Sequence, residues 1–148
     1  MFDKLTNTTD DYSVTILRLA LGALFFAHGA QKVLGWFGGF GFRGTLGFFT
    51  QQMHIPVVLA ILAIAAEFLG GIGLILGFLG RVAAFGIACN MGVAIALFHR
   101  HFGLFANWSG NQKGEGIEYH ILVIAIALVI MIRGSGALSV DRSLSRSL

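Results

Sequence analysis

Several ionisable side chains lie inside or beside otherwise apolar stretches of this sequence, and they are the residues that could do chemistry. Placing an Arg, Lys or Asp at the centre of a membrane helix costs about 2.5–3.5 kcal/mol. A chain that keeps several of them must pair them, hydrate them or use them, so a functional site inside the membrane is expected. The residues are Arg18, His28, Lys32, Glu67, Glu118 and His120.

The first apolar stretch carries a polar stripe. His28, Gln31 and Lys32 are spaced three and four residues apart, which places them on one face of a helix. Arg18 precedes Lys32 by fourteen residues and falls on nearly the same face. The stripe predicts a pocket wall on which Lys32 and His28 donate hydrogen bonds to an anion or a quinone oxygen. In the alternative interpretation, Lys32 extends to the membrane interface and pairs with a carboxylate.

Glu67 is the acidic residue nearest the middle of an apolar stretch. It is predicted to carry a proton or to bind a polar substrate or a metal, or else to be the counter-ion of Arg18 or Lys32. Both roles are compatible, because proton relays in membranes are built from such pairs. Small residues follow Glu67 and would let a neighbouring helix approach closely. They are Gly70, Gly71, Gly73 and Gly77.

Glu118, Tyr119 and His120 begin the last apolar stretch. Residues two apart on a helix point about 200° apart, so Glu118 and His120 are not expected to face the same pocket. We expect Glu118 and Tyr119 to face inward and His120 to face the loop that contains His99 and His101. The spacing of these groups matches no local metal motif, and no metal site is predicted.

The elements that must position these residues are helices. Hydrophobic residues make up 56% of the 148 residues and charged residues 11%. This composition predicts an all-α integral membrane four-helix bundle in a single domain, residues 1–148, with spans over about 14–34, 56–79, 82–98 and 117–133. The fourth span is the weakest, because its charge-free part covers only 121–132. The polar tail after Gly134 is expected to fray.

Two loops are unusually rich in glycine and aromatic residues. The loop over 35–50 alternates Gly with Trp or Phe, and the loop over 99–115 combines His, Phe and Trp with polar residues. Trp and Phe favour the headgroup level of a bilayer. We expect both loops to lie at the interface on the same side of the membrane, where they could roof a pocket. Residues 44–53 are predicted to form a short helix there.

Charge and cysteine content exclude several classes of protein. The ten Lys and Arg residues are scattered, so no nucleic-acid partner is expected. The one cysteine, Cys89, rules out an intrachain disulfide or a dithiol mechanism, and it is expected to be a small buried residue. Residues 1–13 are polar and do not resemble a signal peptide. Five basic residues, Lys4 among them, are expected on the side of the membrane that holds both termini, and four on the other side. This excess favours cytoplasmic termini.

Several longer stretches of this sequence resemble those of a known protein family. The relevant stretches are the Leu17–Gly22 run, His28–Gly39 (HGAQKVLGWFGG), Gly41–Thr45 with Phe48 and Phe49, Glu67–Gly71, and Glu118 with Tyr119. Together they are similar to the DoxX family of small bacterial membrane proteins, over about residues 14–141. The resemblance implies a four-helix protein of the bacterial inner membrane. It also implies an oxidoreductase activity, because related subunits belong to a thiosulfate:quinone oxidoreductase.

On this basis the chain is predicted to be an oxidoreductase, or a subunit of one, that acts on a quinone-like molecule. His28 and Glu67 would be catalytic and deliver protons. The substrate-binding residues would be Arg18, Gln31, Lys32, Glu118 and Tyr119. The sequence has no flavin or nicotinamide fingerprint and no cysteine set for a cluster, so it names no cofactor, and a redox partner protein would have to supply electrons.

The competing hypothesis is a membrane component without enzymatic activity. It would be an assembly scaffold for a redox or stress complex, or a small-molecule permease built as a homo-oligomer. The glycines after Glu67 would then form the face between copies. Asn90 is interpreted as a hydrogen bond between helices in either case.

Overall fold

The apolar stretches form helices at the predicted places. A computed structural model describes residues 5–147, so Lys4, used above for orientation, lies outside the described residues. All regular elements over 5–147 are helical, which confirms the all-α fold. The long helices are α2 (Tyr12–Val33), α4 (Val57–Leu76), α5 (Gly80–Leu97) and α6 (Glu118–Arg133). The shorter elements are η1 (Trp36–Gly38), α3 (Gly41–Gly47), η2 (Phe48–Gln52), η3 (His99–Phe102) and α7 (Val140–Ser147).

Three of the long helices, α2, α4 and α5, are long and apolar enough to cross a membrane. The helix α6 occupies the place of the fourth predicted span but has only 16 residues. At 1.5 Å per residue it is about 24 Å long, shorter than a hydrocarbon core of about 30 Å. The length of α6 is limited by Glu118 at its start and by Gly134 just after its end.

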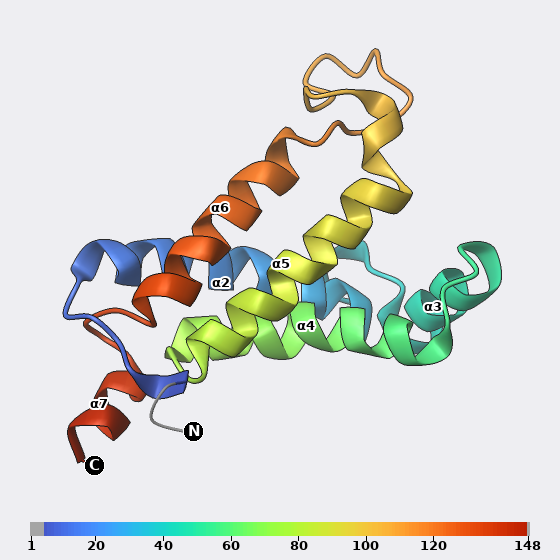
Figure 1. Cartoon of the computed structure of the whole chain (residues 1–148). Helices are drawn as coiled ribbons and strands as arrows, with labels where there is room; N and C mark the ends of the chain where they lie inside the picture. The colour runs from blue at the N-terminus through green and yellow to red at the C-terminus, as the bar shows by residue number, and fades with distance from the viewer. Residues whose placement is uncertain (1–4, 148) are drawn as a thin grey trace.

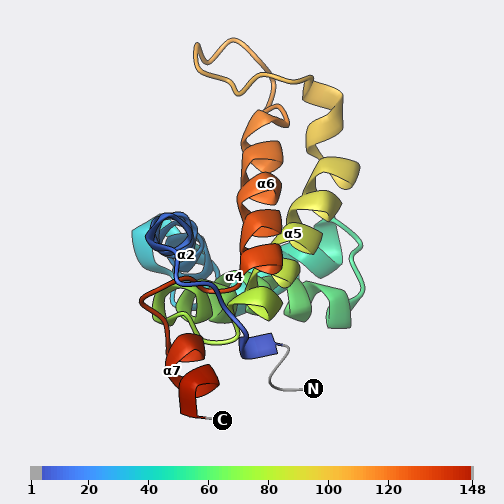
Figure 2. The same ribbon diagram turned by 60° about the vertical axis from the view of Figure 1, so that its left-hand side comes forward.

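The long helices are arranged as two pairs that cross (Figure 1). The helices α2 and α4 lie side by side, and α5 with α6 forms a second pair that rises steeply from them (Figure 2). The two pairs meet in a core of Leu, Ile, Val, Ala, Met and Phe side chains and diverge toward the 98–117 loop. The site described below lies where they diverge.

The pair α2–α4 packs unusually closely, because glycines stand at the contact. A Cβ on Gly71 of α4 would lie 2.4 Å from the backbone nitrogen of Phe26, and a Cβ on Gly29 of α2 would lie 2.4 Å from the Cα of Phe68. Each of these glycines thus meets the backbone of the other helix. Small residues at these spacings allow such contacts between membrane helices. Close packing of this pair fixes the position of Lys32 relative to Glu67.

Arg18 is buried at the end of the molecule that holds the start of α2 and helix α7, with 1% of its surface exposed. Its guanidinium donates to the carbonyl oxygens of Leu74 and Ile75, in the last turn of α4, the second at 2.8 Å. It also donates to the carbonyls of Ser135 at 2.7 Å and Leu138 at 2.5 Å, which follow α6. A cation at a helix C-terminus satisfies unpaired carbonyls and opposes the negative end of the helix dipole.

Asp141 complements Arg18 at the same end. Its carboxylate accepts hydrogen bonds from the backbone N–H groups of Leu79 at 2.8 Å and Gly80 at 3.0 Å, where α5 begins. It also accepts a bond from the Ser135 hydroxyl at 2.6 Å. The expected fraying of the tail is therefore wrong. Although the tail is polar, α7 is held because Asp141 satisfies the free donors of the α5 N-terminus.

The turn from α4 to α5 is sharp, and Gly77 makes it possible. Gly77 caps α4 with φ of 67°, the left-handed region that glycine adopts without steric cost. Leu79 also has positive φ, 50°, just before α5 starts. This strained position is maintained by the hydrogen bond from its N–H to Asp141. The turn redirects the chain and so sets the steep crossing of the two helix pairs.

The start of α2 is tied to the same region. The Asp11 carboxylate caps α2 by accepting a hydrogen bond from the Ser13 N–H at 2.8 Å. This bond holds the pKa of the Asp11 carboxyl below its usual value of 3.8. The Thr9 N–H donates to the carbonyl of Arg133 at 3.0 Å, and the Gly136 N–H donates to the Thr8 hydroxyl at 2.7 Å.

The outward faces of the helices are apolar. Large side chains such as Leu62 of α4 and Phe85 of α5 are 59% and 56% exposed, which suits contact with lipid rather than with water. Cys89 lies on this exposed side of α5, so its predicted burial is wrong. The predicted short helix over 44–53 is present as two adjoining helical segments, α3 and η2.

Replacing Arg18 by Met is expected to destabilise the protein by about 3 kcal/mol or more, because four carbonyls lose a charged donor in a buried place. Thermal unfolding of the detergent-purified variant would show this as a large drop in Tm. Arg100→Met is the matched control, since Arg100 is exposed. Equal Tm values for the two variants would contradict the structural role of Arg18.

Replacing Gly71 by Ala is expected to separate α2 from α4, because the added Cβ would meet backbone and not a flexible side chain. A Tm several degrees below that of the unchanged protein is expected. Gly92→Ala is the matched control, because nothing lies within 4 Å of a Cβ at that helical position. A Gly71→Ala protein as stable as Gly92→Ala would contradict the close helix contact.

Candidate functional site

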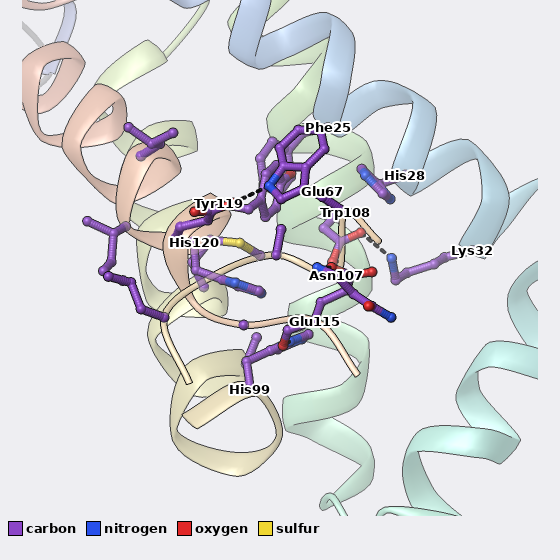
Figure 3. Close-up of a pocket in the computed structure, with 18 residues that line it drawn as sticks. Phe25, His28, Lys32, Glu67, His99, Asn107, Trp108, Glu115, Tyr119 and His120 are labelled. Atoms are coloured by element: carbon purple, nitrogen blue, oxygen red, sulfur yellow. Dashed lines mark hydrogen bonds and ion pairs between the residues drawn. The ribbon is translucent and has the colours of Figure 1, made fainter. Parts of the chain in front are cut away.

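A cavity of about 1070 Å³ lies between the two helix pairs, at the end where they diverge. Figure 3 shows its lining from α2 on one side and from α6 and the 98–117 loop on the other. Most of its surface is apolar, with aromatic side chains from Phe25, Trp108 and Tyr119. A concave, largely apolar space with a few polar groups is the usual form of a small-molecule site.

Glu67 is the centre of the polar wall. The Lys32 Nζ donates to Glu67 Oε2 at 2.5 Å, and the Asn90 Nδ2 donates to Glu67 Oε1 at 2.9 Å. These contacts join α2, α4 and α5 at one carboxylate. The Glu67 side chain is 9% exposed and that of Lys32 is 22% exposed. The ion pair is therefore largely shielded from solvent while it still lines the cavity.

His28 lies beside this ion pair, one helical turn before Lys32. Its ring is 6.3 Å from that of Phe25, measured between centroids, and both residues line the cavity. Tyr119 of α6 lines it from the other helix pair (Figure 3). The cavity thus has an imidazole, an ammonium–carboxylate pair and a phenol around an apolar interior.

The 98–117 loop covers the open end of the cavity. The Trp108 indole Nε1 donates to Glu118 Oε1 at 2.8 Å, and the Asn107 N–H donates to Glu115 Oε2 at 2.7 Å. The His99 Nδ1 is 2.8 Å from the carbonyl oxygen of Glu115. The Trp108 side chain is 86% exposed, so this cover rests on a few polar contacts rather than on a packed core.

The structure brings together most of the residues that the sequence singled out. The cavity is lined by His28, Lys32, Glu67, Glu118 and Tyr119, but not by Arg18 or Gln31. Arg18 shares a helix face with Lys32, but fourteen residues separate them by about 21 Å along α2. Arg18 therefore binds carbonyls at the other end of the molecule. The Gln31 amide instead donates to the carbonyl of Phe37 at 3.3 Å.

Glu118 and His120 both line the cavity, contrary to the expectation that they would face different ways. Glu118 is the first residue of α6, and its carboxylate contacts the covering loop through Trp108, so the cavity extends around the helix start. His120 does contact His99, with ring centroids 4.0 Å apart. Asn90 does make the expected hydrogen bonds between helices.

The cavity also contains His99 and Trp108, which the sequence analysis did not assign to the site, and His120, which it assigned to the side of the loop. The enrichment of the 98–117 loop in His and aromatic residues was the signal for the first two. In the described part of the chain, residues 5–147, no group of three or more His, Cys, Asp or Glu residues could hold a metal ion.

This arrangement can bind an apolar, planar molecule and offer it hydrogen bonds from several directions. Lys32 and His28 can donate to an oxygen on the α2 side. A carboxylate and an imidazole in a shielded place are also the usual groups for proton transfer. The Lys32–Glu67–Asn90 contacts hold Lys32 and Glu67 in position for these roles.

Comparison with known proteins finds a matching family model and related inner membrane proteins. The family model described as DoxX matches residues 13–100. The inner membrane protein YqjF of Escherichia coli (strain K12) is 30% identical over 141 residues, which cover 93% of this chain and 95% of that protein. The inner membrane protein YphA of the same organism is 28% identical over 131 residues, 86% of each chain. No solved structure matches the chain.

Replacing Lys32 by Met is expected to destabilise the protein, because Glu67 would keep a buried charge without its cation. Adding Glu67→Gln to that variant should recover part of the loss, giving a coupling energy above about 1 kcal/mol in a double-mutant cycle followed by thermal or chemical unfolding. The exposed pair Arg133–Asp11, 3.4 Å apart, is the control and should show weaker coupling. Additive effects at Lys32 and Glu67 would contradict a stabilising ion pair.

Proposed function

Since the chain belongs to the DoxX family of integral membrane proteins, we propose that it binds a quinone-like small molecule in the cavity between its helix pairs and takes part in its oxidation or reduction. The observation that carries this proposal is the combination of an apolar, aromatic-lined cavity with shielded proton-transfer groups on its wall. A quinone ring would contact the aromatic side chains, and its oxygens would accept hydrogen bonds.

The division of roles follows from the position of each group. His28 and Glu67 are proposed as the proton-transfer residues, and Lys32, Glu118 and Tyr119 as binding residues. Reduction of a quinone to a quinol takes up two electrons and two protons. The protons would come from the cavity wall, and the electrons from a redox partner protein. Arg18 and Gln31 are left out of the binding set, because they do not line the cavity.

The location in the cell follows from the relatives. Both E. coli relatives are named inner membrane proteins, and we assign this chain to the bacterial inner membrane on that basis. With the termini in the cytoplasm, as the basic residues favour, the 98–117 loop and the open end of the cavity would face the other side of the membrane. A quinone could then enter from the membrane between the helix pairs.

A second function is favoured by a separate observation. Glu67 already has Lys32 and Asn90 as partners, so its charge could serve to hold three helices together and nothing more. The chain would then be a non-enzymatic scaffold or a permease component, and the exposed apolar faces of α4 and α5 would contact a partner or another copy.

The two functions are separated by measuring the Tm of the detergent-purified protein with duroquinone, a fully substituted benzoquinone that cannot alkylate Cys89. If the proposal is right, duroquinone raises the Tm of the unchanged protein, with about 2.7 kcal/mol of stabilisation at one hundred times Kd. Thiosulfate is tested in parallel as a second candidate substrate.

The same ligand-induced shift is then measured for His28→Ala and Glu67→Gln, each against its own ligand-free Tm. Both shifts should be smaller than that of the unchanged protein. His101→Ala, outside the cavity lining, is the control and should retain the full shift. No shift in the unchanged protein, with both cavity variants less stable, would favour the scaffold.

A further inference from the structure

A second hollow, an apolar groove of about 1020 Å³, lies between α4 and α5. Large exposed side chains line it from both helices, among them Leu62 of α4 and Val93 of α5. Small residues stand where the helices come close, since a Cβ on Gly86 would lie 3.4 Å from the Cβ of Ala66. Both helices are long and apolar enough to cross a membrane, so the groove faces hydrocarbon.

The groove adjoins the cavity described above. Three residues line both spaces, namely Glu67 of α4 and Met91 and Ala94 of α5. At this place the Asn90 amide joins the two helices, because it donates to Glu67 at 2.9 Å and lies 3.5 Å from the carbonyl oxygen of Ala63. Farther from their connecting turn, α4 and α5 diverge (Figure 1). The cavity and the groove therefore lie on two sides of the space that opens between these helices.

The polar groups of the groove lie at two places. His54 stands just before α4, and Glu67 and Asn90 stand where the groove adjoins the cavity. The rest of the lining is apolar apart from the thiol of Cys89. This pattern suits a hydrocarbon chain whose polar end lies beside Glu67, and it offers nothing to a polar molecule along the length of the groove.

We propose that the α4–α5 groove holds the hydrocarbon chain of a ligand whose quinone ring lies in the cavity. This inference rests on the proposed function and narrows the ligand to lipid-soluble quinones that carry a long chain. The chain would leave the cavity beside Ala94, which has the smallest side chain of the three shared residues, and continue past Val93 and Leu62.

The chain would add affinity by packing and by its connection to the ring. Surrounding lipid or detergent is as apolar as the groove, so removal from water contributes little to this step. Dispersion contacts with a fitted groove do contribute, because they sum over many atoms. Once the ring is bound, the chain is also held at a high effective concentration beside the groove. A moderate gain in affinity is therefore expected.

The test compares two quinones that differ only in the chain, duroquinone and its analogue with one methyl group replaced by a decyl chain. Both rings are fully substituted, so neither alkylates Cys89. Each Kd is obtained from the dependence of Tm on ligand concentration, with the full-length protein in one detergent. We expect the decyl quinone to bind the unchanged protein about tenfold more tightly than duroquinone.

Val93→Trp fills the groove without touching the lining of the cavity. In this variant the preference for the decyl quinone should fall below about threefold, while the Kd of duroquinone stays the same. Ala96→Trp is the matched control, because it adds the same side chain at an exposed position of α5 outside both spaces. It should retain the full preference.

Cys89 provides a second readout that needs no groove variant. It is exposed, it lines the groove, and it is the only cysteine of the chain. The decyl quinone should slow its labelling by N-ethylmaleimide, followed by mass spectrometry, whereas duroquinone should not. In the control protein with Cys89→Ser and Ala96→Cys, neither quinone should change the labelling rate.

A lost preference in Val93→Trp together with protection of Cys89 supports the inference. An unchanged preference, or no protection of Cys89, would overturn it and assign the groove to membrane lipid or to another copy of the chain. Binding of duroquinone in that case would leave the proposed function standing. Binding of neither quinone would overturn both.

Discussion

The buried guanidinium of Arg18 is the interaction on which the rest of the structure depends. It donates to carbonyls at the end of α4 and to carbonyls after α6, and so ties three parts of the chain that are distant in sequence. Asp141 accepts hydrogen bonds from the free backbone N–H groups at the start of α5. Because helix ends have unpaired backbone groups that lipid cannot satisfy, these two side chains allow α4 to end and α5 to begin within a sharp turn.

The contacts of Arg18 and Asp141 at one end of the molecule explain why the helix pairs separate at the other end. The helix pairs are held together where the segment before α2, the α4–α5 turn and the segment after α6 meet. They cross steeply and diverge toward the 98–117 loop. The cavity occupies the space between them. At the cavity wall, Lys32, Glu67 and Asn90 form a second, smaller set of contacts between helices. The same ionic group thus stabilises the helix contact and faces the proposed ligand, which is how membrane proteins commonly retain a charge within their spans.

The polar groups of the cavity differ in how completely they are satisfied. Glu67 has two partners, whereas His120 has a buried nitrogen with none among the described residues. A satisfied carboxylate contributes mainly to the stability of the unliganded protein. An unsatisfied buried nitrogen lowers that stability.

Composition alone determined that the chain is helical and belongs in a membrane, because long apolar runs have to satisfy their backbone groups internally. The spacing of His28 and Lys32 likewise placed them on one face, and the opposite charge of Glu67 made it a candidate partner. The distance of about 21 Å between Arg18 and Lys32 follows from their spacing, but the carbonyl oxygens that Arg18 binds could not be predicted from it. The order of the α7 tail and the contact of Asp141 with the start of α5 also arise only in three dimensions. Those contacts join residues far apart in the chain, and only the crossing of the helix pairs decides which of them meet.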